Sequence, residues 1–282
     1  MQRQEIARYE PDNSLKKGYL SMFGEIVHEV KSNGWLTRQL FKRGFFAMYK
    51  QSLLGVAWVV ILPLVNVVTF ALLSRSGILN LGSIPVPYPL YAMLGMAFWQ
   101  LFSTGIVSCG SSLTNAGEML QRINFSKKSL VMAEVGKPVV SFAIQCVLVG
   151  ILFVLYGVVP HRAILLIPIV VLPVIVLTLG LGFIVALLNA VARDTGSMLS
   201  VGTSLLMYLT PVLYARPRSG LLGHVTTYNP MYYFITTGRD LVLNGTITEP
   251  KGFVISSLIS CVILLIALMI FHLAETRIAE RL

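Results

Sequence analysis

The chain has 282 residues, of which 55% are apolar and only 12% are charged. A soluble domain carries about 25% charged residues, so this composition argues against soluble domains and excludes disordered, repetitive and disulfide-scaffold classes. A single anchoring helix could not raise the apolar share this far, and we expect a bundle of membrane helices. The net charge of +10 would suggest nucleic acid as a partner of a soluble protein. Here it indicates topology and contact with membrane lipids, and no nucleic-acid partner is expected.

The start of the chain precedes any membrane segment. Residues 1–34 are polar and of mixed charge, without the apolar core of a signal peptide, and we expect a cytoplasmic extension. Residues 35–52 are predicted to contain an amphipathic helix with apolar residues opposite a basic arc. The basic arc comprises Arg38, Lys42, Arg43 and Lys50. A basic helix of this kind lies at the inner leaflet surface; docking on other protein is the alternative.

Long charge-free stretches predict six membrane spans within residues 53–273. Each is close to the ~20 residues that a bilayer requires. The spans are Leu53–Leu73, Leu90–Cys109, Pro138–Val159, Ala163–Ala190, Ser197–Tyr214 and Phe253–Leu273. Pro63, Pro168 and Pro173 fall within them and are expected to kink or locally break the helices. The predicted fold class is an all-α membrane protein with six transmembrane helices.

The distribution of basic residues predicts the orientation of these spans. When the segments between successive spans are assigned to alternate sides of the membrane, 16 of the 22 Lys and Arg residues lie on one side. The segments on that side are 1–52, 110–137, 191–196 and 274–282. The positive-inside rule places this side in the cytoplasm, so both ends, including the tail 274–282, are predicted to be cytoplasmic.

Between the fifth and sixth spans lies a long outer connection. Its two apolar stretches, Leu221–Val225 and Met231–Ile235, are too short to cross a membrane, and Asn229-Pro230 separates them. We predict two short re-entrant helices within residues 219–246, because non-spanning backbone at membrane depth must lie against protein or water. An ordinary ordered loop is the alternative.

The sequence shows no motif for chemistry of its own. It contains no phosphate-binding loop, no His-Glu-x-x-His and no Cys-x-x-Cys. The spans hold no acid near their middles, although proton-driven transporters usually bury one there. Glu134 and Lys137 are interpreted as an interfacial ion pair. We therefore predict no catalytic residue, no metal site and no cofactor in this chain.

Aromatic residues lie in or beside the spans and are candidates for a transport pathway. Aromatic faces stack on sugar rings, although many such residues simply form the aromatic belt of a membrane protein. The pathway candidates are Trp58, Phe70, Phe98, Trp99, Phe102 and Tyr208.

Three motifs together resemble one known family. They are Tyr49-Lys50-Gln51-Ser52-Leu53-Leu54-Gly55-Val56-Ala57-Trp58 followed by Pro63-Leu64, then Arg193-Asp194, then Tyr228-Asn229-Pro230-Met231-Tyr232-Tyr233 with Arg239. In this order they are similar to ABC-2 type exporter permeases over residues 35–275. The pattern is most similar to the polysaccharide branch, which exports O-antigen, capsule or teichoic acid.

The resemblance implies a homodimer in the bacterial cytoplasmic membrane, paired with two copies of a separate ATPase that binds ATP and Mg²⁺. It also implies a coupling helix at 115–124 and an outer gate at 219–246. The residues implied for coupling are Glu118, Arg122, Arg193 and Asp194. The residues implied for substrate entry, where the diphosphate of a lipid-linked glycan would bind, are Arg38, Lys42, Arg43, Tyr49 and Lys50. Those implied for the gate are Tyr228, Asn229, Pro230, Tyr232, Tyr233, Phe234 and Arg239.

Two other functions remain open at this point. One is an ABC-2 permease for a drug, haem or another small lipid. The other is a membrane enzyme acting on polyprenyl phosphates, which would need acids or histidines clustered near one leaflet.

Overall fold

The structure is a computed structural model that describes residues 19–50, 57–76, 84, 86–116, 126–192, 194–215 and 220–278. Within these ranges all regular structure is helical, which confirms the all-α class. The helices are α2 (Tyr19–Ser32), α3 (Gly34–Lys50), α4 (Trp58–Ser76), α5 (Tyr88–Asn115), α7 (Lys127–Glu134), α8 (Gly136–Leu155), η2 (Arg162–Leu166), α9 (Ile167–Val191), α10 (Asp194–Leu209), α11 (Gly220–Tyr228), α12 (Pro230–Leu243) and α13 (Pro250–Ile278).

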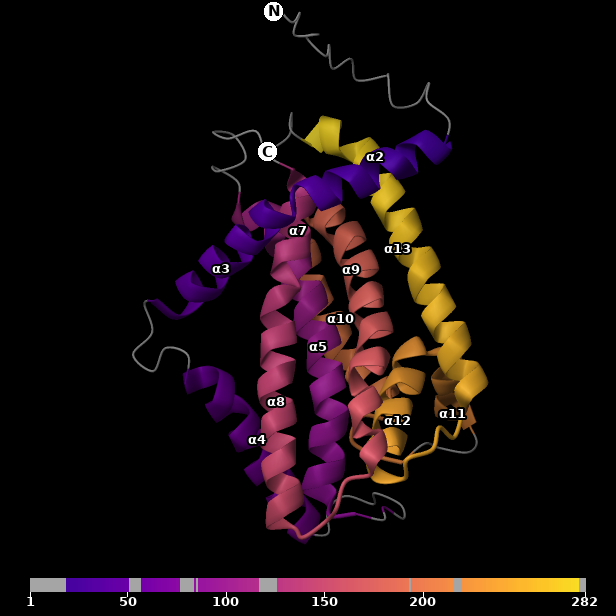
Figure 1. Cartoon of the computed structure of the whole chain (residues 1–282). Coiled ribbons are helices and arrows are strands. Elements are labelled where there is room, and N and C mark those ends of the chain that lie inside the picture. The colour runs from indigo at the N-terminus through magenta and orange to yellow at the C-terminus, as the bar shows by residue number, and fades with distance from the viewer. Residues whose placement is uncertain are drawn as a thin grey trace, which may run out of the picture.

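Four helical segments are long and apolar enough to cross a membrane: Tyr88–Asn115, Lys127–Leu155, Arg162–Val191 and Pro250–Glu275. They correspond to the second, third, fourth and sixth predicted spans, and α5, α8, α9 and α13 run side by side in Figure 1. The chain is thus a multi-pass membrane protein. The first and fifth predicted spans correspond to α4, which has 19 residues, and to α10, which has 16.

The centre of the bundle is the contact between α5 and α9. Glycines bring the two backbones close: a Cβ added to Gly182 would lie 2.5 Å from the Cβ of Cys109, and one added to Gly110 would lie 2.5 Å from Val185. Small residues at such positions let membrane helices pack tightly. Apolar clusters fill the bundle at both ends, one around Cys109, Val131 and Phe271 and another around Leu90 and Leu152.

Two of the three prolines that were predicted to kink or break their spans lie inside continuous helices. Pro63 lies inside α4 and Pro173 inside α9, and both helices continue through them. Pro168 lies in the first turn of α9, after the 3₁₀ helix η2, where its missing N–H leaves no intrahelical bond unmade.

The two ends of the bundle are built differently. α2 and α7 lie at the same end as the C-terminal part of α13, whereas α11 and α12 lie toward the opposite end (Figure 1). The residues predicted to act at the inner and outer membrane surfaces are therefore well separated.

Candidate functional site

The predicted basic helix is present as α3, which begins at Gly34 and ends at Lys50. The side chains of Arg38, Lys42 and Arg43 are exposed. Tyr49 and Lys50 belong to the last turn, and their side chains lie outside the described part. The exposed arc can meet the phosphates of a lipid surface or of a lipid-linked substrate.

The other face of α3 docks on the foot of α7 and α8. The ring of Phe41 lies directly against Gly136, where a Cβ would clash with it. A Cβ on Gly44 would lie 3.1 Å from Lys137. Lys137 Nζ in turn lies 2.5 Å from Glu134 Oε2, which confirms the predicted interfacial ion pair. α3 thus docks on the chain and still exposes a basic arc, and its place at the inner leaflet surface stays a prediction.

A buried lysine that the sequence analysis missed joins three helices at this end. Lys128 of α7 is 1% exposed, and its Nζ donates to Glu29 of α2 at 2.7 Å and to Glu275 of α13 at 2.5 Å. Ser126 also donates to Glu29 at 2.7 Å. Burial raises the pKa of the Glu29 carboxyl, but the bonds from Lys128 and Ser126 outweigh burial and hold this pKa below its usual value. We call Glu29, Lys128 and Glu275 the lysine node.

Glu29, His272 and Glu275 have ligand atoms within 4.8 Å of one another, close enough to share a metal ion. The Lys128 ammonium group, however, already binds both carboxylates. A cation would have to displace this ammonium group and would meet its repulsion, so the chemistry of the node fits an ion-pair network better than a metal site.

Near the predicted coupling elements, Asn189 of α9 joins three helices. Its Nδ2 donates to Gly110 O of α5 at 3.0 Å, and its Oδ1 accepts from the N–H of Gly196 in α10 at 3.2 Å. Asp194 is the first residue of α10, where a negative charge suits the helix dipole. Glu118, Arg122 and Arg193 lie outside the described residues, as does most of segment 115–124, so their predicted coupling role stays a prediction.

The predicted pathway aromatics divide into two groups. Trp58 and Tyr208 are 42% and 66% exposed and are available to a ligand. The other four are packed into the apolar core of this chain, with 7% exposure or less. They are Phe70, Phe98, Trp99 and Phe102. Rings buried in a packed core offer no face to a sugar, so this arrangement does not favour their predicted role.

The chain break predicted at Asn229-Pro230 separates α11 from α12. The side chain of Asn229 accepts from the N–H of Met231 at 3.0 Å and so caps α12, and its Nδ2 donates to Thr210 Oγ1 at 2.7 Å. α12 is longer than predicted from Met231–Ile235, since it extends to Leu243.

Arg239 of α12 is 5% exposed and does not reach toward headgroups. Its guanidinium donates to the carbonyl of Pro211 at 3.1 Å and to that of Val212, just beyond the end of α10. The guanidinium carbon lies 3.7 Å from the centroid of the Tyr91 ring in α5. These contacts tie α12 to α5 and to the segment after α10.

The gate aromatics also hold α11 and α12 in place. Tyr232 donates to Glu249 and Tyr233 donates to Thr227 O, both at 2.8 Å. Phe234 is fully buried, whereas Tyr228 is 86% exposed at the end of α11. These contacts fix the two helices against the bundle; a gating role for them stays a prediction.

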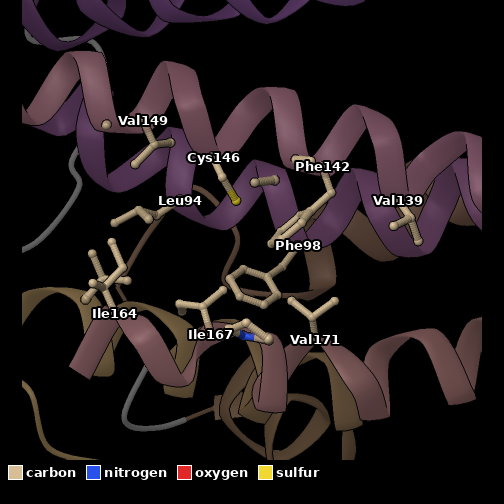
Figure 2. A pocket seen from close by; sticks show the side chains of 14 residues that line it. Leu94, Phe98, Val139, Phe142, Cys146, Val149, Ile164, Ile167 and Val171 are labelled. Atoms are coloured by element: carbon tan, nitrogen blue, oxygen red, sulfur yellow. The ribbon is translucent and has the colours of Figure 1, made fainter. Parts of the chain in front are cut away.

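An apolar cavity of about 460 Å³ lies between α5, α8 and α9. In Figure 2 the rings of Phe98 and Phe142, which are in edge-to-face contact, line it together with Leu94, Cys146 and Val171. Its walls offer hydrocarbon almost throughout. Such a cavity suits an apolar group and does not suit a hydrophilic chain.

Comparison with known proteins was informative. The model of the family described as "ABC-2 type transporter" matches residues 36–243. The chain is 26% identical to the O-antigen export system permease protein RfbA of Myxococcus xanthus, over 90% of this chain and 98% of that protein. It is 26% and 27% identical to two proteins of the same name from Klebsiella pneumoniae, each match covering 82% of this chain and 89% of the relative.

Proposed function

We propose that this chain, which belongs to the ABC-2 type transporter family, is the membrane subunit of an exporter of lipid-linked polysaccharide in the bacterial cytoplasmic membrane. The observation that carries this proposal is the similarity to three O-antigen export permeases along 82% or more of the chain. In this proposal the chain is a transport subunit without catalytic residues, and a separate ATPase binds ATP and Mg²⁺. Two copies of this chain pair with two copies of the ATPase.

The helix directions support six spans. The inner end of α5 packs with α7 and α13, and its outer end packs with the end of α8. In this proposal the chain passes from α3 at the inner surface to Tyr88 at the outer surface, and α4 is the helix that the structure describes between them. It must likewise pass from Val191 to Pro250, and α10 is the helix available for that crossing. The proposed architecture is thus six spans, the interface helix α3 and the short outer helices α11 and α12.

In the proposed mechanism, motion of the ATPase reaches the permease through segment 115–124. That segment connects α5 to the residues just before Lys128, and the lysine node passes its movement to α2 and α13. The exposed Arg38, Lys42 and Arg43 attract the diphosphate of the substrate to the cytoplasmic mouth. At the outer end, α11 and α12 yield to let the glycan leave.

The direct test is deletion of the gene in its host, followed by analysis of surface polysaccharide. We expect the surface glycan to disappear while its lipid-linked form accumulates inside, and a plasmid copy to restore export. Normal surface glycan in the deletion strain would contradict the proposal and would favour an ABC-2 permease for a small molecule or lipid.

The partner is tested separately by a charge reversal at Glu118→Lys with Arg122→Glu. We expect the variant to insert in the membrane but to lose export and to lose stimulation of the co-purified ATPase. Charge reversal at Lys251, which is exposed in the first turn of α13 at its other end, is the control. If the coupling variant exports normally, the coupling helix lies elsewhere.

A further inference from the structure

The apolar cavity between α5, α8 and α9 opens at the outside of the bundle. Its deep wall is formed by buried residues such as Leu94 and Phe98 of α5. Other lining residues are exposed and form two edges, one on α8 and one on the segment from η2 into α9, which lie on opposite sides of the cavity (Figure 2). These exposed residues are Ala143, Cys146, Gly150, Ile164 and Pro168. We call the gap between the two edges the mouth.

Small side chains keep the mouth open. The α8 edge consists of Ala143, Cys146 and Gly150, and a Cβ added to Gly150 would meet no atom within 4 Å. Beside this edge, α8 exposes the larger apolar side chains of Val147 and Ile151, which are 64% and 50% exposed. Because α8 belongs to a membrane span, the mouth is a recess at membrane depth in an otherwise apolar surface.

The cavity has the length of one lipid leaflet. Its lining residues on α8 run from Val139 to Gly150, which is about 16 Å along the helix axis at 1.5 Å per residue. The hydrocarbon core of a bilayer is ~30 Å thick, so each leaflet contributes about 15 Å. One end of the cavity lies at Ile164 of η2, in the first turn of a span. A lipid chain lying along the helices therefore matches the cavity in length.

The volume and the walls of the cavity also suit a hydrocarbon chain. Its volume is about 460 Å³, and an apolar cavity of ~150 Å³ is already large enough to bind benzene. Its lining residues include no polar side chain other than the Cys146 thiol. Water needs two or more polar partners to be held in a cavity, and an empty cavity forfeits dispersion contacts along its whole wall. A flexible apolar chain is the occupant that avoids both costs.

Arg162 stands at the end of the cavity that lies in η2. It is the first residue of η2, is exposed, and precedes Ile164 by two positions, about 4 Å along a 3₁₀ helix. Among the residues that the structure describes, no acidic side chain pairs with it. The neighbouring Leu165 and Leu166 are 82% and 46% exposed, so this turn presents a cation together with hydrocarbon. A guanidinium group binds a phosphate through two parallel hydrogen bonds.

We propose that the cavity is a lipid site, which holds one acyl chain of a membrane phospholipid while Arg162 binds the phosphate of its headgroup. The chain enters through the mouth, and in the proposed orientation of the protein it belongs to the outer leaflet. Val242 at the end of α12 also lines the cavity, and its carbonyl accepts from the N–H of His161, just before η2, at 2.9 Å. The bound lipid therefore contacts α5, α8, α9 and α12 at once and supports the position of α12.

The first test asks whether a lipid chain enters the cavity. The full-length protein is placed in phosphatidylethanolamine vesicles that contain phosphatidylglycerol with a photoreactive diazirine near the end of one acyl chain, and labelled residues are mapped after illumination. We expect label at Leu94 and Phe98, which are buried and which lipid around the bundle does not reach. Label confined to outward residues such as Val147 and Ile151 would overturn the proposal.

Competition identifies the occupant. We expect excess unlabelled phosphatidylglycerol to remove the label from Leu94 and Phe98. If a polyprenyl phosphate removes it at an amount where phosphatidylglycerol does not, the cavity holds the tail of a substrate and the proposal is wrong. Absence of any label within the cavity would mean that another helix or a second copy covers the mouth, which also overturns the proposal.

The second test fills the cavity from its own wall. Cys146→Phe puts a ring into the space, and Cys261→Phe is the matched control, because Cys261 is exposed on α13 and does not line the cavity. We expect loss of label at Leu94 and Phe98 in the first variant and full label in the second. Gly150→Leu should act like Cys146→Phe, and its side chain has open space to enter, so it keeps the test valid if the ring prevents folding. Full label in folded Gly150→Leu or Cys146→Phe would contradict a chain in this cavity.

The third test concerns the phosphate. Arg162→Gln should weaken labelling within the cavity about fivefold, as the loss of one cation at a lipid surface implies. The control is Lys251→Gln, since Lys251 is also exposed, in the first turn of another span, and this variant should label like the parent. If the two variants label equally, Arg162 does not bind the headgroup.

Discussion

Lys128 is the most buried charged side chain in the part of the chain that the structure describes. Removing one partner from a buried ion pair leaves the other charge uncompensated, at a cost of about 3–5 kcal/mol. Glu29 and Glu275 keep partial exposure, with 29% and 18% of their side chains accessible, so we expect the lower end of that range. Lys128→Met should reduce the free energy of unfolding by about 3 kcal/mol, measured by chemical unfolding of the purified protein.

The control for this prediction is Lys251→Met, since Lys251 is exposed at the start of α13. An exposed charge contributes little to stability, and we expect a change within about 0.5 kcal/mol. Equal stability of the two variants would show that the lysine node does not hold the three helices together.

The lysine node could not be predicted from the sequence, for a physical reason. Its members are separated by 99 and 147 positions along the chain, and only the packing of α2, α7 and α13 brings them together. The contacts of Arg239 were partly predictable, because a lone arginine between spans suggests either a buried acceptor or a lipid headgroup as its partner. Which of the two it meets depends on the carbonyls freed at the end of α10.

Hydropathy predicted more of the structure at the scale of helices than at the scale of single residues. Apolar runs and charge-free lengths depend on local sequence, so the long spans and the amphipathic α3 were predictable from residue order alone. The break before α12 was predictable as well, because Asn229-Pro230 acts through its own backbone. The packing of the pathway aromatics was not, since hydropathy does not distinguish a ring buried against α12, such as Phe98, from one facing a channel.

The close contact between α5 and α9 allows a prediction about a substitution at Gly182. In Gly182→Ala the new methyl group would lie 2.5 Å from the Cβ of Cys109, which is too close for real side chains, so the helices must separate. We expect a loss of about 1–3 kcal/mol, measured as lower yield of folded protein and a lower unfolding midpoint.

Gly202→Ala is the matched control, because nothing lies within 4 Å of a Cβ at that helical position of α10. Alanine is favoured over glycine within helices by about 1 kcal/mol, so this variant should be as stable as the parent or more so. A destabilised Gly202→Ala together with a neutral Gly182→Ala would contradict the predicted α5–α9 packing.

The docking of α2 should depend on pH through Glu29. Its folded-state pKa lies below the unfolded value of about 4.3. A group with a depressed pKa contributes stability that is complete above the unfolded pKa and is lost as pH falls through the folded pKa. We expect α2 to stay docked from neutral pH down to about 4.3 and to loosen below it, measured by hydrogen exchange of its amides.

Glu29→Gln separates this effect from general acid unfolding. The variant lacks the titrating group, so α2 should be looser at pH 7 and should change less on acidification than in the parent. Identical pH profiles for the two proteins would assign the acid response to another group.

At the scale of the whole molecule, the lysine node constrains topology. Glu29 and Glu275 bind the same ammonium group, so α2 and the C-terminal end of α13 lie on one side of the membrane. An even number of crossings must then separate them. The four long spans satisfy this parity, and so do six. The proposed architecture has six, because α5 begins at one end of the bundle whereas α3 lies at the other (Figure 1).

The last prediction is that α4 crosses the membrane. If α4 crosses the membrane, a reporter after Asn80 is outside and one after Leu282 is inside, as the excess of basic residues on the inner side also requires. We expect phosphatase activity only from the Asn80 fusion and fluorescence of a cytoplasmic reporter only from the Leu282 fusion. α4 has 19 residues and is about 28 Å long at 1.5 Å per residue, close to the ~30 Å of a hydrocarbon core. Inserting charged residues at Leu62 should then abolish the outside signal at Asn80. Like signals from both fusions would mean that α4 stays on one side, and the six-span architecture would be wrong.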